Sequence, residues 1–307
     1  MIRKHTRRAA KAAFAISLGV AIVIGLFAGA ARSAPAASPT IVLGTKNFAE
    51  EFILGSLYQQ ALQAKGFKVV NKGSLGSTEI IQTALTSGKI NFYPEYTGVI
   101  VQDVFHHTFS GASAAATTKL ATTLEATKGF TVLNATPFYD TDVVAVTNAT
   151  AAKYGLKSIS DLKKAGSFKF GGFPECQTRN TCFVGYTKQY GLKNASFLSV
   201  GSISPYAALD AGTVLAADVF STDPPLGQGS KYTVLADPKH VTGFQNVVPI
   251  VKASVATAAG STFTATVNAV SAKLSQNAIV AMNKAVEVDK QTPAAVAKAF
   301  LKANGLI

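Results

Sequence analysis

Two stretches decide the fold: Ile41-Val-Leu-Gly-Thr-Lys-Asn-Phe-Ala-Glu50 and, further along, Asn91-Phe-Tyr-Pro-Glu-Tyr-Thr-Gly98. Each is a short apolar run that leads into a polar, aromatic turn. Such runs are typical of buried parallel strands. Because turns at the carboxyl ends of neighbouring parallel strands are where open α/β sheets hold ligands, we expect a small-molecule site here.

The segments around these two stretches predict alternating helices and strands. Asn47 and Glu50 have the spacing of a capping-box-like pair, and Gly66 is the expected end of the helix that follows. A second helix is expected to begin at Ser77 or Thr78. The resulting β-α-β-α-β order specifies a parallel sheet with right-handed crossovers.

A second α/β pattern follows, and the chain then returns to the first. We expect one lobe from residues 39–142 and 248–307 and another from residues 143–247. Two α/β lobes joined by crossing strands predict a hinged clamp that closes around a ligand.

The amino-terminal segment has the features of an export signal. A basic head is followed by the uncharged apolar run 12–31 and then by small residues, so residues 1–34 resemble a secretory signal peptide. An uncleaved anchor is the alternative, because twenty uncharged residues can just span a bilayer. Either way, we expect the folded part to lie outside the cytoplasm, in the periplasm or cell envelope.

The net charge of +13 overstates how basic the folded part is. Residues 1–34 contain six basic residues and no acid, which leaves a charge of +7 for the remainder. The remaining lysines form no block of like charges, so we expect no nucleic-acid partner.

The chain contains two cysteines, Cys176 and Cys182. In an exported chain, two close cysteines most simply form one disulfide. Half of a metal site is the alternative, but no histidine lies near either cysteine in the sequence. His106 and His107 lie in a polar loop and are expected to face solvent, and neither a metal nor a cofactor is predicted.

Six motifs together resemble one family, the substrate-binding proteins of ABC importers for glycine betaine, choline, carnitine and related quaternary ammonium compounds. The motifs are Gly44-Thr-Lys-Asn-Phe-Ala-Glu50, Leu75-Gly-Ser-Thr-Glu79, Tyr93-Pro-Glu-Tyr-Thr-Gly98, Lys153-Tyr-Gly-Leu156, Phe220-Ser-Thr-Asp223 and Ala299-Phe-Leu-Lys-Ala-Asn-Gly-Leu306. The resemblance implies a type II periplasmic-binding-protein fold and a ligand held between the lobes in a box of aromatic rings. It also implies a membrane-embedded ABC permease as partner and a monomeric binding protein.

A quaternary ammonium group has no N–H to donate, so aromatic ring faces bind it through cation–π attraction. By position, the resemblance implies that Tyr96 and Phe220 are walls of this cage and that Lys46 lies near the ligand or the cleft between the lobes. A further wall is expected at Phe244 or Gln245, where the register is uncertain by one residue.

Arg179 attracts attention without the family, because no other arginine follows Arg32. It lies between the two cysteines, in a loop that a disulfide would stiffen. A guanidinium offers two parallel donors to a carboxylate. The resemblance implies that it either clamps a ligand carboxylate or latches the lobes.

Some positions depart from the family pattern. Asp142 stands where the family commonly has a cage tyrosine, and Val99 replaces a common threonine, whereas Asp140 matches a family acid. Tyr139 is a candidate to replace the missing ring. With Asp140 and Asp142 near a cation, a ligand with N–H donors, such as an amine, is as consistent with the sequence as betaine.

Two other classes of function remain as alternatives. An exported enzyme is disfavoured, because the sequence has no nucleophile elbow, no zinc-protease motif and no dinucleotide-binding motif. A ligand-sensing module on the same fold is the second alternative, and it would need a separate signalling partner.

Overall fold

The computed structural model describes residues 38–107, 113–201, 203–227 and 229–307. The signal peptide or anchor expected at residues 1–34 therefore lies outside the described residues. Within the described ranges, no helix combines the length and the apolar character needed to cross a bilayer.

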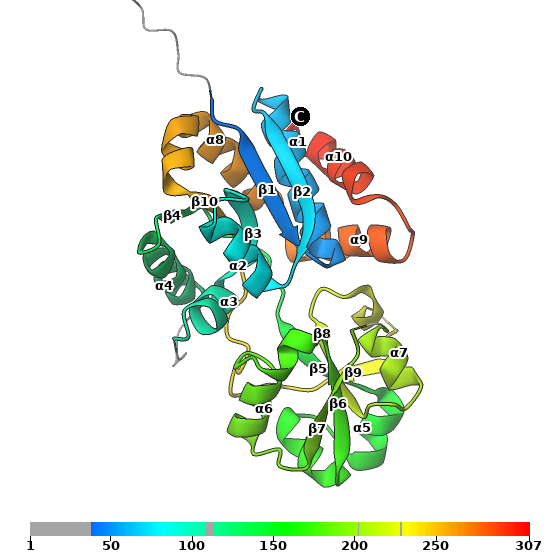
Figure 1. Ribbon diagram of the computed structural model, residues 1–307. Helices are drawn as coiled ribbons and strands as arrows, with labels where there is room; N and C mark the ends of the chain where they lie inside the picture. Colours follow the sequence, from blue (N-terminus) through cyan, green and yellow to red (C-terminus); the bar gives the residue numbers. More distant parts are fainter. Residues whose placement is uncertain (1–37, 108–112, 202, 228) are drawn as a thin grey trace, which may run out of the picture. The chain divides into compact units, whose positions relative to one another are not determined.

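The first lobe is built on a five-stranded sheet (Figure 1). Its strands, in spatial order, are β2 (Val69–Gly76), β1 (Ile41–Lys46), β3 (Phe92–Tyr96), β10 (Val247–Lys252) and β4 (Phe130–Val132). β1 pairs with β2 and β3 in parallel, as the sequence predicts, whereas β10 runs antiparallel to its neighbours β3 and β4.

Helices cover both faces of this sheet. They are α1 (Ala49–Ala64), α2 (Thr78–Thr86), α3 (Thr97–Val99), the π-helical turn η1 (Ile100–Val104), α4 (Ala114–Ala126), α8 (Ala253–Lys273), α9 (Gln276–Glu287) and α10 (Pro293–Ala303). α1 packs against α8, α9 and α10, which come from the opposite end of the chain. The return of the chain after residue 246 therefore completes the core of the first lobe.

The second lobe is a separate five-stranded sheet in the order β7 (Ala195–Ser199), β6 (Phe168–Gly172), β8 (Ala216–Phe220), β5 (Asp142–Thr147) and β9 (Tyr232–Val234). β6 pairs in parallel with β7 and β8, and β5 runs antiparallel to β8 and β9. Its helical elements are α5 (Asn148–Tyr154), η2 (Ile159–Ala165), η3 (Pro174–Gln177), α6 (Phe183–Tyr190), α7 (Pro205–Asp210) and η4 (Pro224–Leu226). The two-lobed α/β fold predicted from the sequence is confirmed.

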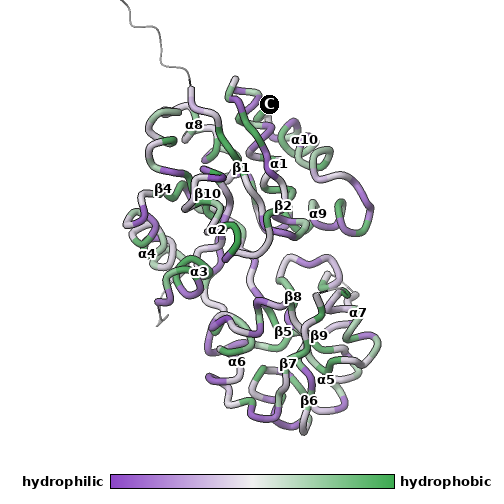
Figure 2. Tube along the Cα trace, viewed as in Figure 1, coloured by the Kyte–Doolittle hydropathy of each residue, from purple (hydrophilic) through white to green (hydrophobic). Residues whose placement is uncertain are grey.

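Each lobe has its own apolar core. β1, β3 and α1 bury side chains such as Leu43, Phe92 and Leu57 in the first lobe, and β5, β6 and α6 bury Val144, Phe170 and Tyr186 in the second. Figure 2 shows hydrophobic segments along the strands of both lobes. Because each core is complete by itself, the cavity between the lobes does not have to be filled by apolar packing.

Two segments connect the lobes, one before β5 and one before β10. They pair with each other through an isolated antiparallel bridge between Tyr139 and Asn246 and a hydrogen bond from the Asp140 amide to the Gln245 carbonyl, 3.2 Å. These paired crossing segments are the only covalent connections among the described residues of the two sheets, as a hinge requires.

One local prediction is wrong. The residue that caps α1 is Phe48 and not Asn47, and no side chain caps this end. Glu50 is buried in the first turn and is bound by side chains from distant parts of the chain. Long-range hydrogen bonds therefore replace the local capping pair that the spacing predicts.

Candidate functional site

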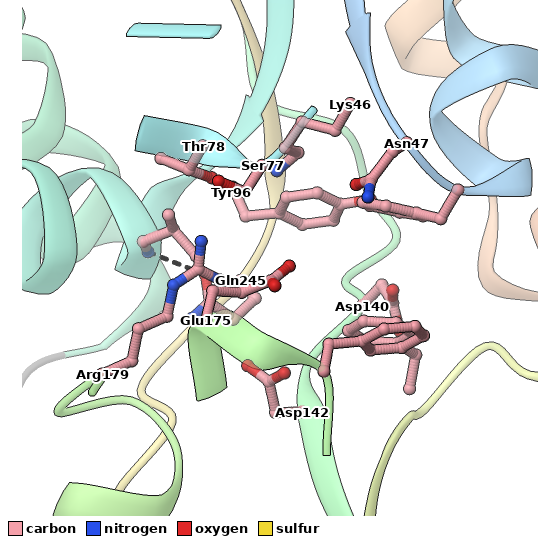
Figure 3. A pocket seen from close by; sticks show the side chains of 14 residues that line it. Lys46, Asn47, Ser77, Thr78, Tyr96, Asp140, Asp142, Glu175, Arg179 and Gln245 are labelled. Atoms are coloured by element: carbon pink, nitrogen blue, oxygen red, sulfur yellow. Dashed lines mark hydrogen bonds between the residues drawn. The ribbon is translucent and has the colours of Figure 1, made fainter. Parts of the chain in front are cut away.

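A pocket lies between the two lobes, at the carboxyl ends of β1, β3 and β8, and we call it the cleft pocket (Figure 3). Its volume is about 590 Å³, counting the open space at its mouth. Asp142 enters the pocket from the second lobe because β5 begins there, paired with Phe220 at the end of β8. The strand ends that the sequence indicates thus meet at one site.

Seven of the nine predicted ligand-binding residues line the cleft pocket: Lys46, Tyr96, Asp140, Asp142, Arg179, Phe220 and Gln245. The structure places the other two, Tyr139 and Phe244, on a different hollow beside the crossing segments. The side chain of Tyr139 is 52% exposed. The ring of Phe244 stacks on that of His240, with centroids 6.2 Å apart.

Four aromatic rings form a continuous stack along the cleft pocket. Phe48 stacks on Tyr96 at 6.2 Å and on Phe220 at 5.4 Å, and Phe220 in turn stacks on Phe173 at 6.0 Å. Sequence reasoning missed Phe48 and Phe173. Phe48 lies inside the first quoted stretch and Phe173 directly follows β6, but the resemblance that selected Tyr96 and Phe220 selected neither of them.

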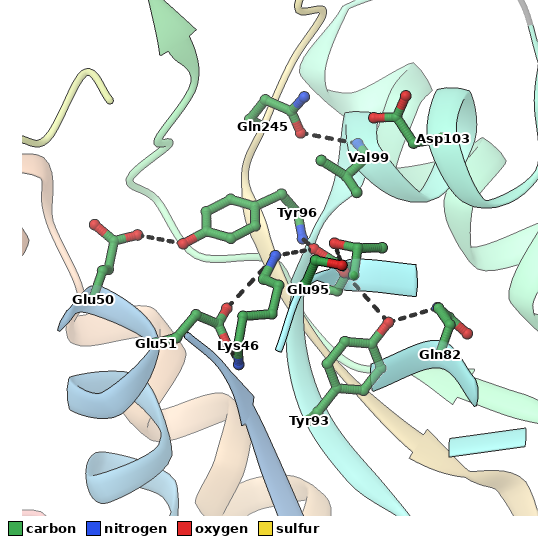
Figure 4. Close-up of polar contacts among 12 residues, drawn as sticks. Lys46, Glu50, Glu51, Gln82, Tyr93, Glu95, Tyr96, Val99, Asp103 and Gln245 are labelled. Carbon is green, nitrogen blue, oxygen red and sulfur yellow. Dashed lines mark hydrogen bonds and ion pairs between the residues drawn. The ribbon is translucent and has the colours of Figure 1, made fainter. Parts of the chain in front are cut away.

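Lys46 is buried under this stack at the end of β1. Its ammonium group lies 4.1 Å from the centroid of the Tyr96 ring and forms an ion pair with the carboxylate of Glu95 (Figure 4). A second carboxylate, that of Glu51, lies 3.9 Å away. The positive charge of Lys46 is therefore neutralised inside the first lobe.

The hydroxyl of Tyr96 is also fully engaged. It donates to Glu50 Oε1 at 2.7 Å (Figure 4), while Glu50 Oε2 accepts from Thr222 of the second lobe at 2.7 Å and from Asn283 of α9 at 3.0 Å. Burial raises the pKa of Glu50 above its ordinary value, although these hydrogen bonds oppose the shift. The hydroxyl of Tyr96 is therefore bonded within the protein, and the Lys46 ammonium lies over one face of its ring.

Two aspartates from the first crossing segment and β5 reach the cleft pocket. Asp140 accepts hydrogen bonds at Oδ1 from the Ser221 hydroxyl and the Thr222 amide, both at 3.1 Å. Burial and the neighbouring Glu50 raise the pKa of Asp140 well above its ordinary value. Burial raises the pKa of Asp142 to about 6, although the positive charge of Arg179 lowers it.

Arg179 reaches across from the second lobe to the first. Its Nη2 donates to both carboxylate oxygens of Glu79 on α2, at 3.0 and 3.2 Å, and its Nε donates to one of them at 3.2 Å. Burial raises the pKa of Glu79, but the charge of Arg179 and the hydrogen bonds from Ser77, from the Glu79 backbone and from Arg179 together lower it by more, so the net shift is downward. A disulfide between Cys176 and Cys182 closes the loop that carries Arg179, as the sequence predicts.

Gln245 is buried and its amide is bound to the backbone. Its Oε1 accepts from the Val99 amide at 3.1 Å, and its Nε2 donates to the Thr242 carbonyl at 2.7 Å. A side chain at Gly98 would place its Cβ 2.7 Å from Gln245 Nε2, so glycine is required there. Gln245 therefore shapes the pocket floor and fixes the crossing segment to the first lobe.

The pocket also contains polar side chains that sequence reasoning did not select: Asn47, Ser77, Thr78 and Glu175. Thr78 donates to Glu95 Oε2 at 3.0 Å, which helps to hold the partner of Lys46. Asn47 and Ser77 lie inside motifs quoted above, but their types gave no reason to choose them over neighbouring turn residues.

The described residues contain one cluster with metal-ligand chemistry, formed by Cys176, Cys182 and Asp218. Because the two cysteines are joined in a disulfide, neither offers a thiolate. His106 and His107 are both exposed.

Comparisons with known proteins place the chain in one family. Residues 39–303 match the family model of the substrate-binding domain of ABC-type glycine betaine transport systems. A glycine-betaine-binding protein of Pseudomonas aeruginosa is 29% identical over 297 residues, covering 92% of each chain. The glycine betaine-binding protein YehZ of Escherichia coli is 30% identical over 238 residues, covering 72% of this chain and 76% of YehZ.

A solved structure of apo YehZ from Escherichia coli superimposes with a TM-score of 0.62 at 27% identity, covering 88% of this chain and all of that one. The family model spans both lobes and the crossing segments that line the cleft pocket. The chain belongs to the family of substrate-binding domains of ABC-type glycine betaine transport systems.

Proposed function

We propose that the chain captures a quaternary ammonium compound, or a related cationic or zwitterionic osmolyte, in the cleft pocket. It then delivers this ligand to an ABC permease from the outer side of the cytoplasmic membrane. The family consists of transport proteins that bind solutes, and we propose that this chain likewise binds its ligand without chemical change.

The observation that carries the proposal is the charge balance of the cleft pocket. Both basic groups in its lining are already paired, Lys46 with Glu95 and Arg179 with Glu79. The lining carboxyl groups of Asp140, Asp142 and Glu175 have no such ion pair among the described residues. The carboxyl groups of this lining thus outnumber its bases although residues 35–307 carry a net charge of +7, and a cationic ligand would stabilise their ionised forms.

The aromatic stack adds cation–π attraction to the charge attraction of the carboxyl groups. A cation over an aromatic face gains about 0.5 to 2 kcal/mol per ring, and more when water is excluded. Tyr96, Phe48 and Phe220 provide three rings within one stack, and the last two carry no hydroxyl to hydrate. In this proposal, a quaternary ammonium head separates the lobes enough to contact these ring faces.

A ligand with N–H donors is a second candidate, and Asp142 favours it. A carboxyl group lines the pocket where the resemblance implies a tyrosine, so it can accept a hydrogen bond that a trimethylammonium group cannot donate. Sensing on the same fold has no specific observation in its favour. The lobe boundaries at 142/143 and 247/248 remain part of the proposal, although β5 begins at Asp142 and β10 at Val247, one residue before each boundary. The roles of the nine predicted ligand residues also remain part of it.

Calorimetric titration of residues 38–307 tests the ligand class, with glycine betaine, choline, carnitine and simple amines as ligands. We expect Tyr96→Ala to weaken binding by about tenfold, the equivalent of one cation–π contact, and Tyr96→Phe to weaken it much less. Tyr139→Ala is the matched control, because that tyrosine is exposed and outside the pocket. Binding of none of these compounds, or equal losses in both Tyr96 variants, would reject the proposed recognition.

A further inference from the structure

A second hollow lies behind the aromatic stack, and we call it the acidic hollow. It shares Phe48, Phe173, Phe220 and Asp140 with the cleft pocket and extends toward η4 and α9. Its volume is about 970 Å³, counting the open space at its mouth. The rings of Phe48 and Phe220 therefore form the partition between two connected spaces.

The ionisable side chains that line the acidic hollow are acidic. Its ionisable carboxyl groups are those of Glu50, Asp140, Asp223 and Glu287, and none of the described lining residues is basic. Outside the lining, the charge of Lys46 acts on Glu50 and that of Lys290 acts on Glu287, and Lys290 donates to the backbone carbonyl of Glu287 at 2.6 Å. The hollow thus gathers a quarter of the sixteen acidic residues of the chain without a compensating base in its described walls.

Several oxygen atoms of these walls have no donor. The hydrogen bonds to Asp223 go to Oδ2, from the Phe220 amide and the Tyr206 hydroxyl, both at 2.9 Å. The carboxylate of Glu287 accepts no hydrogen bond within the part of the chain that the structure describes. These positions can accept, but cannot donate, when the carboxyl groups are ionised.

Asn283 provides an independent sign of a missing donor. It lines the acidic hollow and is 2% exposed. Its Nδ2 donates to Glu50 and to the Thr222 carbonyl, which fixes the amide orientation, but its Oδ1 has no hydrogen-bond partner among the described residues. Buried side-chain oxygens are almost always bonded, so this orphan acceptor indicates a site for a donor.

The raised pKa values of the carboxyl groups in the acidic hollow are consistent with a site for a cationic donor. Burial raises the pKa of Asp223 to about 7, although the Phe220 amide and the Tyr206 hydroxyl lower it. Burial and the nearby Glu50 also raise the pKa of Glu287, although Lys290 lowers it. A bound cation would relieve the repulsion within this group.

We propose that the acidic hollow is a second cation subsite, one that binds a primary or secondary ammonium group. Besides the rings that it shares with the cleft pocket, its walls offer carboxylate and amide acceptors without a base, so it favours a cation with N–H donors over a quaternary head. Because it adjoins the cleft pocket, the two subsites together accept an elongated dication with a quaternary head at one end and an amine at the other. This inference rests on the proposed function of the cleft pocket.

The probes are ω-aminoalkyl-trimethylammonium compounds of increasing chain length, with choline as the single-cation reference. We expect one chain length to bind at least about tenfold more tightly than choline, since a charge-assisted hydrogen bond is among the stronger polar contacts. Glu287→Gln should abolish most of this advantage and leave choline affinity unchanged, because Glu287 is not in the cleft pocket. Asp289→Asn is the matched control, since this exposed acid lies two residues away and outside the hollow.

The outcomes separate the two proposals. Choline binding without an advantage for any amine would overturn the second subsite and leave the proposed function intact. Equal effects of Glu287→Gln and Asp289→Asn would also overturn it, because they would indicate a general charge effect. An amine advantage that depends on Glu287 supports the subsite even if choline binds weakly, and binding of neither compound class overturns both proposals.

Discussion

The two walls of the cleft pocket, one from each lobe, differ in how far their charged groups are paired with groups of opposite charge. On the first-lobe wall, the buried cation Lys46 forms an ion pair with Glu95 and lies 3.9 Å from Glu51, whose pKa burial raises to about 8. On the second-lobe side, Asp142 lines the pocket, and its charge acts on Asp218, which lies outside the lining and whose Oδ1 has no hydrogen-bond partner among the described residues. Burial and the charge of Asp142 raise the pKa of Asp218 well above its ordinary value.

This difference in charge pairing predicts different roles for the two walls in ligand binding. A neutralised wall needs no ligand to be stable, so the first lobe can hold the Tyr96 ring in place before binding. A wall with uncompensated carboxyl groups is less stable alone and gains most when a cation arrives. On this account, the first lobe positions the ligand and the second lobe supplies most of the charge selectivity.

The largest expected effect comes from breaking the neutralised wall. Lys46→Met leaves Glu95 buried without its cation, and we expect a loss of about 3 to 5 kcal/mol in the free energy of unfolding. Urea denaturation measures it, with Lys68→Met as control, because Lys68 is an exposed lysine of the same lobe. Adding Glu95→Gln to Lys46→Met should recover part of the loss. Equal stabilities of Lys46→Met and Lys68→Met would contradict the account.

The disulfide of the second lobe is expected to have the next largest effect. Cys176→Ser combined with Cys182→Ser removes a cross-link with a sequence separation of 6 residues. The chain-entropy model gives a loss of about 2 kcal/mol for so short a loop. Reduced wild-type protein should unfold at the same denaturant concentration as the double variant. Insensitivity of the wild type to reductant would show that this bond contributes little.

Removing the charge of Asp142 from the second-lobe wall should raise the free energy of unfolding, whereas Lys46→Met should lower it. The folded-state pKa of Asp142, about 6, lies above its ordinary value of 3.8, so the folded chain binds more protons between these values. The contribution of Asp142 to stability is therefore present at acidic pH and is lost as the pH rises through about 6. For this half-buried group we expect Asp142→Asn to stabilise the chain by about 1 kcal/mol at pH near 8 and not at pH near 4.

The same substitution should weaken the binding of choline at pH near 8, because an ionised carboxylate attracts the cation and an amide does not. Thermal unfolding and calorimetric titration at both pH values measure the two effects. The control is Asp161→Asn, because hydrogen bonds to Lys164 and to nearby backbone amides hold the pKa of Asp161 at about 2, so no gain is expected there. A loss of stability in Asp142→Asn at the higher pH would contradict the contrast between the walls.

Breaking the ion pair that joins the two walls should have the smallest effect of the changes considered, and we expect it on ligand affinity. Arg179 and Glu79 form a partly exposed ion pair, for which about 0.5 to 1 kcal/mol is typical. Because Glu79 already engages the guanidinium, we expect Arg179→Ala and Glu79→Gln to weaken choline and glycine betaine binding equally, by about two- to fivefold. A loss confined to glycine betaine would show that Arg179 clamps the ligand carboxylate instead.

Much of the framework could be predicted because apolar periodicity is a local property of the sequence. β1 at Ile41–Lys46 and β3 at Phe92–Tyr96 lie in the two apolar runs quoted first, and α2 begins at Thr78, as expected. The family resemblance then selects Lys46, Tyr96 and Phe220, and all three line the cleft pocket. The antiparallel direction of β10 was not foreseen, since one strand has no periodicity that reveals its direction.

The parts that were missed depend on distant partners. Glu50 has the local spacing of a cap, but its carboxylate binds Thr222 and Asn283, which are 172 and 233 residues away in the sequence. Phe48 looked like an ordinary turn residue until the second lobe placed Phe220 against it. Likewise, nothing local distinguishes the exposed Tyr139 from a cage tyrosine, because only the crossing-segment geometry directs it away from the cleft pocket.

The central claim is that positive charge, and not shape alone, holds the ligand between the two walls. It is tested most directly by calorimetric comparison of choline with its uncharged carbon isostere, in which a tert-butyl group replaces the trimethylammonium head. The account predicts that choline binds at least about tenfold more tightly, the equivalent of one desolvated cation–π contact. Equal affinity for the two compounds would contradict it.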